Sequence, residues 1–372
     1  MTSDSAASLA QVAKRAGVSI ATASRVINGI ANKATAATAA RVHRAVEELG
    51  YRPISVGRAL RHGRSRLVAL LAANLANPTM AAIAASVETA LRREGLVMVL
   101  CDTHERPKVQ DEYLLEMRAQ LVRATVLLGA VPSPQLAAMH SAGEPLLFVN
   151  RRSPHDPTRP FVGIDNASAG RGVAMFFLDR NIPVAGAIQG SLGSSATADR
   201  LAAFGARLSA AGRPLAASQI VSVADDLDHM VIGYRSVDAL LDRCTDRPVA
   251  HPVGIFCLSD LIAYGAHRRL TERGVAVPEQ VCLVGFDDNP LNDWVAPWLS
   301  SVRVPYAAFG AAVVQGLRDL WAGEPPSARV LPHALVARLS PPLATRSGAC
   351  VGPDLPVTGP PMTQPRQRRP GG

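Results

Sequence analysis

The side chains best suited to reading a nucleic acid are gathered in one short stretch, residues 19–28. Arg25 carries a two-pronged donor that can pair with the acceptor edge of a guanine. Ile20 and Ala21 can meet thymine methyl groups or exclude polar base edges. The hydroxyl and amide side chains that can reach phosphate oxygens are Ser19, Thr22, Ser24 and Asn28. If one helix presents these side chains together, they form a surface that reads double-stranded DNA.

Two short helices and a tight turn are expected to position this stretch. Apolar residues recur at helical spacing from Leu9 to Ala16 and again from Ile20 to Ile27. Between them, Gly17-Val18-Ser19 combines a residue that tolerates a left-handed turn with a good helix N-cap. This pattern predicts a helix-turn-helix, whose second helix enters the major groove with its N-terminal residues against base edges. A third helix is expected from about Ala36 to Leu49, ended by Gly50.

The distribution of charge also favours a DNA-binding head. Residues 1–66 hold 11 Lys or Arg against three Asp or Glu, so +8 of the chain's net charge of +9 lies there. A strongly basic end on a nearly neutral body is typical of a module that binds a polyanion. The alternative is a small helical bundle that binds other proteins and whose charges are merely solvated. The concentration of charge makes that alternative the weaker one.

The N-terminal motifs resemble those of the lactose/galactose repressor (LacI/GalR) family of transcriptional regulators. The resemblance lies in SLAQVAKRAGVSIATASRVING, followed by VEELGYRP. A Val-Ala pair, Ala-Gly-Val-Ser and Ser-Arg-Val-Ile-Asn match the family signature nearly throughout. The resemblance implies a helix-turn-helix DNA-binding domain over residues 1–52.

A hinge is implied by the same resemblance over residues 53–66. The family's hinge leucine corresponds to Leu60 and wedges into the minor groove at the centre of a pseudo-palindromic operator. Arg61 would neutralise phosphates beside it. Because a pseudo-palindrome has two half-sites, the resemblance also implies a homodimer.

The rest of the chain alternates short apolar runs with Ala-rich helical segments. The runs are LVALLAANL, LVMVLCD, ATVLLGA, PLLFVN, VAGAIQG, VGIFCLSD and VCLVGFDD. Repeated βα alternation predicts parallel sheets with helices on both faces, and this many strands fit two doubly wound subdomains. Ligands are expected at the carboxyl ends of such strands. The expected fold class is therefore α + α/β, with an N-terminal helix-turn-helix domain and hinge helix followed by a two-subdomain α/β sensor.

The resemblance extends through this body to about Arg346. It rests on Asn77-Pro78, VGIDNASAG, SDLIAYGA, VGFDDNP and WVAPWLSSVRVP. It implies a periplasmic-binding-protein-like effector-binding and dimerisation domain over 67–346. The expected subdomain bounds are 67–162 plus 291–325 for the first and 163–290 plus 326–345 for the second. Residues 347–372 form a tail rich in Pro, Gly and Arg that is expected to be disordered.

The same motifs imply effector-facing positions in the sensor: Asn77, Asn150, Arg200, Ser259 and Asp287. For Arg200 and Asp287 there is a chemical reason as well, since a guanidinium and a carboxylate can together hold vicinal hydroxyls in a dry cleft. The alternative is an interdomain ion pair that sets cleft closure without a ligand. Departures from the family pattern, such as Val122-Arg123-Ala124-Thr125, keep open a sensor that has changed or lost its ligand.

No local pattern predicts catalysis. The sequence has no Walker-type phosphate loop, no HExxH, no GxSxG elbow, and five scattered cysteines without zinc-ligand spacing. Asp287 and Asp288 are adjacent on an expected strand, so their side chains should point in opposite directions rather than act as an acid–base pair. We therefore expect no catalytic residue, no metal site and no cofactor.

These observations predict a cytoplasmic repressor that binds a double-stranded DNA operator as a homodimer. A small polar effector, such as a sugar or related metabolite, would modulate it. The chain has no apolar run of about 18 residues and its N-terminus has no secretory-signal pattern, so we expect no membrane span. The first alternative is a DNA-binding regulator with a degenerate sensor that responds to no small molecule. A solute-binding protein is the second, although it would need a signal peptide and no basic head.

Overall fold

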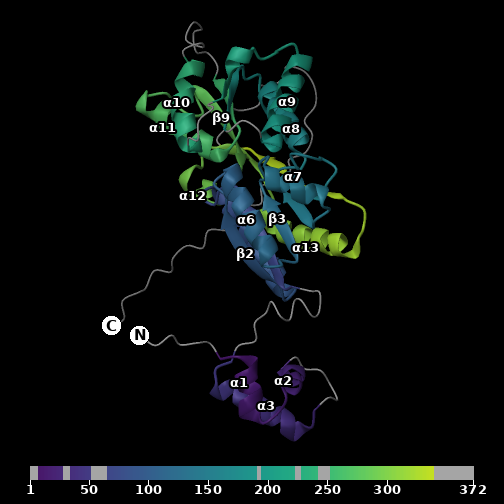
Figure 1. Cartoon of the computed structure of the whole chain (residues 1–372). Helices are drawn as coiled ribbons and strands as arrows, with labels where there is room; N and C mark the ends of the chain where they lie inside the picture. Colours follow the sequence, from purple (N-terminus) through teal and green to yellow (C-terminus); the bar gives the residue numbers. More distant parts are fainter. Residues whose placement is uncertain are drawn as a thin grey trace, which may run out of the picture.

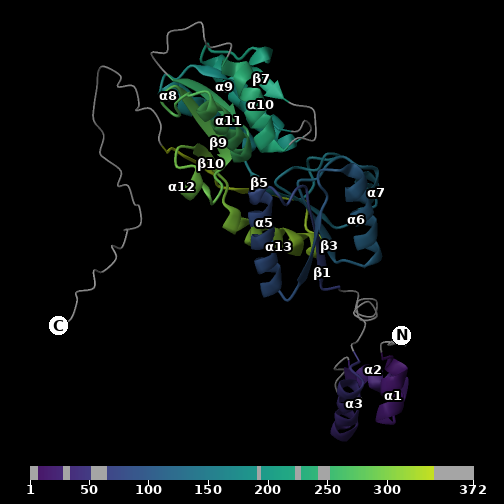
Figure 2. The ribbon, with the colours of Figure 1, turned by 90° about the vertical axis from the view of Figure 1, so that its left-hand side faces the viewer.

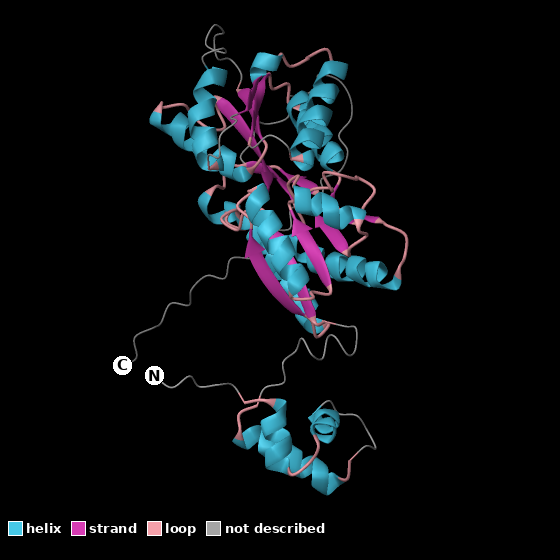
Figure 3. Ribbon diagram, in the orientation of Figure 1, coloured by secondary structure: helices cyan, strands magenta, loops and turns pink. Residues whose placement is uncertain are grey.

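In the residues that the computed structural model describes, three short N-terminal helices precede two six-stranded sheets, each flanked by helices (Figures 1 and 3). The structure describes residues 7–27, 34–51, 65–190, 194–222, 228–241 and 252–338. Among these residues, no helix is both long and apolar enough to span a bilayer.

The head consists of α1 (Leu9–Ala16), α2 (Ile20–Ile27) and α3 (Ala36–Glu48). A capping box starts α1, in which Ser8 accepts from the Gln11 amide and donates its own amide to the Gln11 side chain. The helix ends at Gly17, whose φ of 61° turns the chain toward α2. The three helices bury one small apolar cluster, made of Val12, Ala13, Ala16, Ala23, Val42 and Ala45. The predicted helix-turn-helix is confirmed.

The first sheet has the strand order β11-β5-β4-β3-β1-β2, and every neighbouring pair is parallel. Its strands are β1 (Leu67–Ala72), β2 (Val97–Asp102), β3 (Ala124–Leu128), β4 (Leu146–Val149), β5 (Phe161–Ile164) and β11 (Ala328–Leu331). One face is covered by α5 (Pro78–Arg93) and α13 (Tyr306–Ala322), and the other by α6 (Pro107–Ala119) and α7 (Pro134–Ser141) (Figure 2).

The second sheet has the order β12-β10-β9-β8-β6-β7, with only the β10–β12 pair antiparallel among its described strands. Its strands are β6 (Val184–Gln189), β7 (Ile220–Ser222), β8 (Val253–Cys257), β9 (Val281–Asp287), β10 (Ser300–Arg303) and β12 (Ala334–Val336). One face packs against α8 (Asn166–Asp179) and α9 (Ser195–Ala210), and the other against α10 (His229–Leu241) and α11 (Asp260–Glu272). A 3-10 turn (Ala217–Gln219) precedes β7, and the short α12 (Asn292–Val295) precedes β10.

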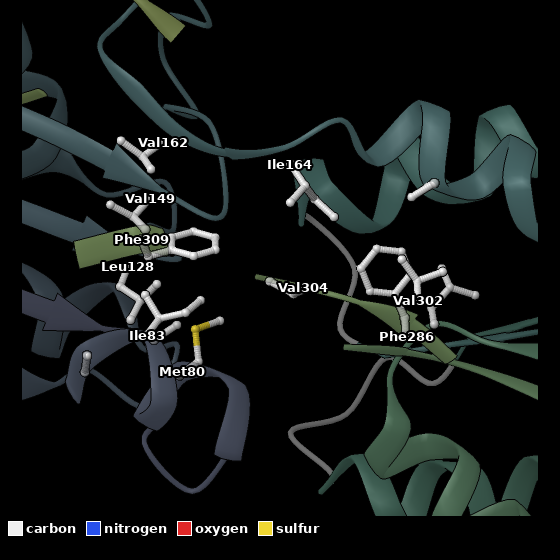
Figure 4. Close-up of a cluster of buried hydrophobic side chains, with 14 of the residues drawn as sticks. Met80, Ile83, Leu128, Val149, Val162, Ile164, Phe286, Val302, Val304 and Phe309 are labelled. Atoms are coloured by element: carbon white, nitrogen blue, oxygen red, sulfur yellow. The ribbon is translucent and has the colours of Figure 1, made fainter. Parts of the chain in front are cut away.

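The chain passes between the two sheets three times: after β5, after β10 and after β11. One apolar cluster runs along these passages, with Ile164 and Val304 between the side chains of the two sheets (Figure 4). The sheet assignments differ from the expected subdomain bounds, because β10 lies in the second sheet and β11 in the first. Neither strand, SSVR or ARVL, is a continuous apolar run, so the sequence pattern did not show which sheet each one joins.

Candidate DNA-reading surface and effector site

The N-terminal end of α2 presents an exposed surface built on its cap. Ser19 caps the helix, with its Oγ accepting from the Thr22 amide at 3.1 Å and lying 2.9 Å from the Thr22 hydroxyl. Ile20 is 55% exposed, and Ala21 and Arg25 are exposed beside it. Neighbouring helices add the exposed basic side chains of Lys14, Arg15, Arg41 and Arg44. The N-terminal end of α2 is therefore polar and exposed, and the head as a whole carries exposed basic side chains, of which Arg15 is paired with Glu48.

One residue predicted to contact phosphate, Ser24, does not lie on this exposed surface. Ser24 is only 8% exposed, because it sits next to Ala23 on the side of α2 that faces the rest of the head. Single-residue chemistry suggested a phosphate contact, but helical periodicity turns this hydroxyl inward. Asn28, Leu60 and Arg61 lie outside the described residues.

In the body, Arg200 is held in place on several sides. Its Nε donates to Asn166 Oδ1 at 2.8 Å, and its Nη1 donates to the Leu258 carbonyl at 3.1 Å. The guanidinium carbon lies 3.3 Å from the centre of the Phe286 ring. Burial lowers the pKa of Arg200 to about 10, while the nearby Asp287 acts to raise it. The side chain therefore stays charged and is fixed before any ligand arrives.

Asp287 ends β9 beside this arginine. It is buried and has a φ of 113°, a conformation that L-residues rarely adopt. Burial raises the pKa of its carboxyl to about 7, and the charge of Arg200 acts to lower it. The Thr79 hydroxyl, at the start of α5 over the first sheet, also acts to lower this pKa. Asp287 thus joins the two subdomains at the carboxyl end of a strand.

Tyr306 reinforces this junction, and sequence reasoning missed it. Its hydroxyl donates to the Asp287 carbonyl at 2.5 Å and lies 3.4 Å from Thr79 Oγ1. The residue begins α13, directly after the return from the second sheet to the first. The available signal was its place two residues after Val304, where the crossover motif ends.

Ser259 caps α11 and contacts a histidine that was also missed. Its Oγ accepts from the Ile262 amide at 3.3 Å and lies 3.1 Å from Nδ1 of His229. Burial lowers the pKa of His229. Arg200 bonds to the carbonyl of Leu258, the residue directly before Ser259, and Ser259 therefore lies close to Arg200.

The two predicted asparagines have chiefly local roles in the structure. Asn77 caps α5 by accepting from the Thr79 amide at 3.0 Å, which places it two residues before the contact to Asp287. Asn150 follows β4 with a φ of 66°, and its amide donates to the Val162 carbonyl at 2.9 Å. The structure thus gathers Arg200, Asp287 and Ser259 most closely.

A buried acid behind the site was not predicted. Asp260 accepts from Ser301 Oγ at 2.6 Å, from the Asn289 amide at 2.7 Å and from Asn292 Nδ2 at 2.8 Å. Burial raises its pKa to about 6. These bonds hold the loop after β9, and with it the backbone of Asp287. Across the described part of the chain, no three His, Cys, Asp or Glu side chains are grouped to hold a metal ion.

Comparison with known families identifies two matching regions. Residues 8–53 match the family described as bacterial regulatory proteins, lacI family, and residues 178–340 match a periplasmic binding protein-like domain. A transcriptional regulator of Pseudomonas putida, PtxS, is 28% identical over 86% of this chain and 91% of its own. The ribose operon repressor of Halalkalibacterium halodurans is 29% identical over 81% of this chain and 86% of its own.

Solved structures agree in fold. The transcriptional regulator CelR, in complex with cellobiose, is 29% identical and superposes with a TM-score of 0.65 over 90% of this chain and 99% of its own. The lac repressor dimer bound to operator and an anti-inducer is 23% identical and shares the fold, with a TM-score of 0.74 over 89% of this chain and 98% of its own. These relatives are transcription regulators and not enzymes. With the capped, basic helix-turn-helix and the two-sheet sensor in place, the chain belongs to the LacI family and is a DNA-binding transcriptional regulator.

Proposed function

We propose that the protein is a cytoplasmic repressor that binds a pseudo-palindromic operator as a homodimer and is modulated by a small polar effector, such as a sugar. The observation that carries the effector part is two buried, oppositely charged side chains: Arg200 is held by Asn166 and the Leu258 carbonyl, and Asp287 is bonded through its backbone to Tyr306 of the first subdomain. A ligand that hydrogen-bonds to this pair would change how the subdomains meet. That change would alter how two heads are presented to DNA.

For DNA reading, we assign base contacts to Ile20, Ala21 and Arg25. Ser19 and Thr22 would contact phosphates from the same helix end, and Asn28, Leu60 and Arg61 remain assigned from the family resemblance alone. The exposed cap of α2 supports this assignment, since a recognition helix meets base edges with its N-terminal residues.

The homodimer is supported by apolar side chains on the surface of one copy. On and beside α12, Leu291 is 54%, Trp294 83% and Val295 64% exposed. On the edge strand β2, Val97 and Leu100 are 49% and 43% exposed. Each subdomain thus has an apolar patch that a second copy of the chain would bury.

A regulator without an effector is the second candidate, and one observation favours it. Thr79 lies within hydrogen-bond distance of Tyr306, and Tyr306 bonds to the Asp287 carbonyl, so the protein's own groups link the two subdomains at this point. Arg200 and Asp287 would then only hold the two subdomains together.

One experiment separates these candidates. DNA bound by the full-length protein is selected in vitro, and the affinity for the selected operator is measured with and without a panel of sugars and related metabolites. A panel member that changes operator affinity in the wild type and not in Arg200→Ala supports the effector site. If Arg200→Ala keeps the whole response, the site is misplaced. If no compound acts on the wild type, the regulator without an effector is favoured.

A further inference from the structure

A second arginine–carboxylate pair lies at the carboxyl end of the first sheet. Arg151 follows β4, is 9% exposed, and its Nη2 donates to Glu105 Oε1 at 2.9 Å. Glu105 follows β2, and its amide bonds to the Ala73 carbonyl just after β1. Gly129, after β3, lies close to the guanidinium, since an added Cβ would be in van der Waals contact with Arg151 Nε at 3.7 Å. The pair therefore sits at the strand ends where doubly wound sheets bind ligands.

His229 faces this pair from the second subdomain. Glu105 and Arg151, which follow strands of the first sheet, influence the pKa of its ring. Asp228, the residue directly before it, does so as well. Arg151 also acts on Arg200, so the two arginines share one neighbourhood. A direct bond fastens the facing loops, because the Arg152 amide donates to Ser195 Oγ, at the start of α9, at 3.1 Å.

The ring of His229 is oriented by its neighbours. Ser259 Oγ accepts from the Ile262 amide and lies 3.1 Å from Nδ1 of His229, to which it can donate its proton. In that arrangement Nε2 carries the hydrogen and becomes a donor. A methyl group at Gly190 would lie 2.5 Å from Nε2, so glycine at this position keeps space around the donor.

Both guanidinium groups near this junction have a carboxylate beside them. Arg151 pairs with Glu105, and Arg200 neighbours Asp287. Such a pair suits a ligand with adjacent hydroxyls, because the guanidinium donates to one hydroxyl and the carboxylate accepts from the next. An anionic ligand would instead place its charge near Glu105 and Asp287, and like charges brought together weaken binding.

We propose that Glu105, Arg151 and His229 form the first-sheet half of the effector site and select a neutral polyhydroxylated ligand over the acid of the same skeleton. This inference rests on the effector-binding function proposed above. Glu105 is the specificity-determining residue, since it balances the charge of Arg151. His229 adds one fixed donor from the opposite subdomain.

The test is a change of selectivity in the full-length protein. Binding of D-glucose, D-galactose and cellobiose is measured by calorimetry, each beside the corresponding uronic acid. The wild type should bind the neutral member of a pair about tenfold more tightly. Glu105→Gln keeps the shape and leaves Arg151 uncompensated, so the preference should fall about tenfold or reverse. His229→Phe should weaken both members of the pair alike.

Glu94→Gln is the matched control, because Glu94 pairs with Arg318 at 2.6 Å on the exposed faces of α5 and α13. It should leave the wild-type preference unchanged. If Glu105→Gln also retains that preference while Arg200→Ala abolishes binding, the effector function stands and this inference is overturned. A wild type that prefers the acids overturns it too. Absence of binding in every pair contradicts both proposals.

Discussion

Two arginines in this chain have opposite surroundings. Arg25 is exposed at the end of α2, where its five donors are available to a base edge. Arg200 is buried, with Asn166 and the Leu258 carbonyl bonded to it and Phe286 beneath it. Composition cannot distinguish the two. Burial and partners decide that one can read DNA and the other can hold a small ligand.

The first prediction concerns Arg25. Arg25→Ala should cost about 1–3 kcal/mol of operator affinity and relax the base preference at one position in each half-site. In vitro selection of bound DNA would show the relaxed position directly. Arg92→Ala, which alters an exposed arginine paired with Glu88 on α5, is the control and should leave the selected sequence unchanged. An unchanged selection with Arg25→Ala would contradict base reading by this side chain.

The second prediction concerns pH. Burial raises the pKa of Asp287 from 3.8 to about 7, so the folded state holds this proton more tightly than the unfolded chain does. The free energy of unfolding should therefore fall as pH rises from about 4 to about 7. Relative to Asp287→Asn, the wild type should lose at most about 1.4 kcal/mol per pH unit over that interval. Urea unfolding at a series of pH values measures the difference.

Asp238 provides the control for this pH effect. A hydrogen bond from Arg269 lowers the pKa of Asp238, so its contribution is present at neutral pH and is lost only as pH falls below about 4. Asp238→Asn should therefore leave the slope between pH 4 and 7 unchanged. Equal slopes for the wild type and Asp287→Asn would show that Asp287 does not titrate in this range.

Contacts of individual side chains could not be predicted from the sequence, for a physical reason. Apolar spacing shows which face of a helix is buried. The prediction for Ser24 considered only the chemistry of its hydroxyl, and the residue lies on the buried face. His229, Tyr306 and Asp260 were missed because their partners lie 19 to 41 residues away along the chain. Such contacts depend on which strands become neighbours in the sheet, and the spacing of nearby residues does not predict this.

Among the elements, α10 and α11 show the closest packing of two helices in the second subdomain. Gly233 on α10 meets the carbonyl oxygen of Ile262, and Gly265 on α11 meets that of Met230, with no room for a side chain at either glycine. These contacts hold His229 and Ser259 in register, because the two residues lie at the starts of the same two helices. Helix packing therefore fixes a site contact.

The third prediction follows from this packing. Gly233→Ala should lower the free energy of unfolding by about 1–3 kcal/mol, because the added methyl group must push the helices apart. Gly205→Ala on α9 is the matched control, since nothing lies within 4 Å of the new group. That control should gain about 0.5–1 kcal/mol through helix propensity. Chemical denaturation of both variants measures the contrast, and equal effects would contradict the packing argument.

Strands with continuous apolar runs were predictable, and strands without them were not. The apolar runs that predicted strands contain β1, β2, β3, β4, β6, β8 and β9. The strands β10 (SSVR) and β11 (ARVL) contain polar or charged residues and form no continuous apolar run, which is why the expected bounds at 291 and 326 differ from the structure. Strand pairing at a sheet edge is decided by backbone bonds, which any residue other than proline can make.

In the whole molecule, one apolar cluster joins the two sheets. Val68 and Val126 of the first sheet belong to the same cluster as Phe256 and Val284 of the second, with Val304 between them (Figure 4). The two subdomains therefore share a core as well as the connecting segments. A ligand at the site proposed beside Arg200 and Asp287 would act next to that core, since Phe286 belongs to it.

The fourth prediction belongs to the assembly. If a second copy covers the α12 patch, Trp294→Glu should raise the dissociation constant of the dimer about 30-fold, equivalent to about 2 kcal/mol. Sedimentation velocity over a range of concentrations measures this. Met175→Glu, on α8 and 44% exposed, is the control and should leave the dimer intact. A Trp294→Glu protein that remains dimeric would place the interface elsewhere.

The three passages between the sheets have a consequence for synthesis on the ribosome. The head is complete once α3 has emerged, whereas the first sheet waits for β11, which ends at Leu331. The second sheet closes only with β12, five residues later. Every nascent copy thus has a finished DNA-reading head long before it has a finished sensor, and a chain that stops early keeps the head while its sensor is left incomplete.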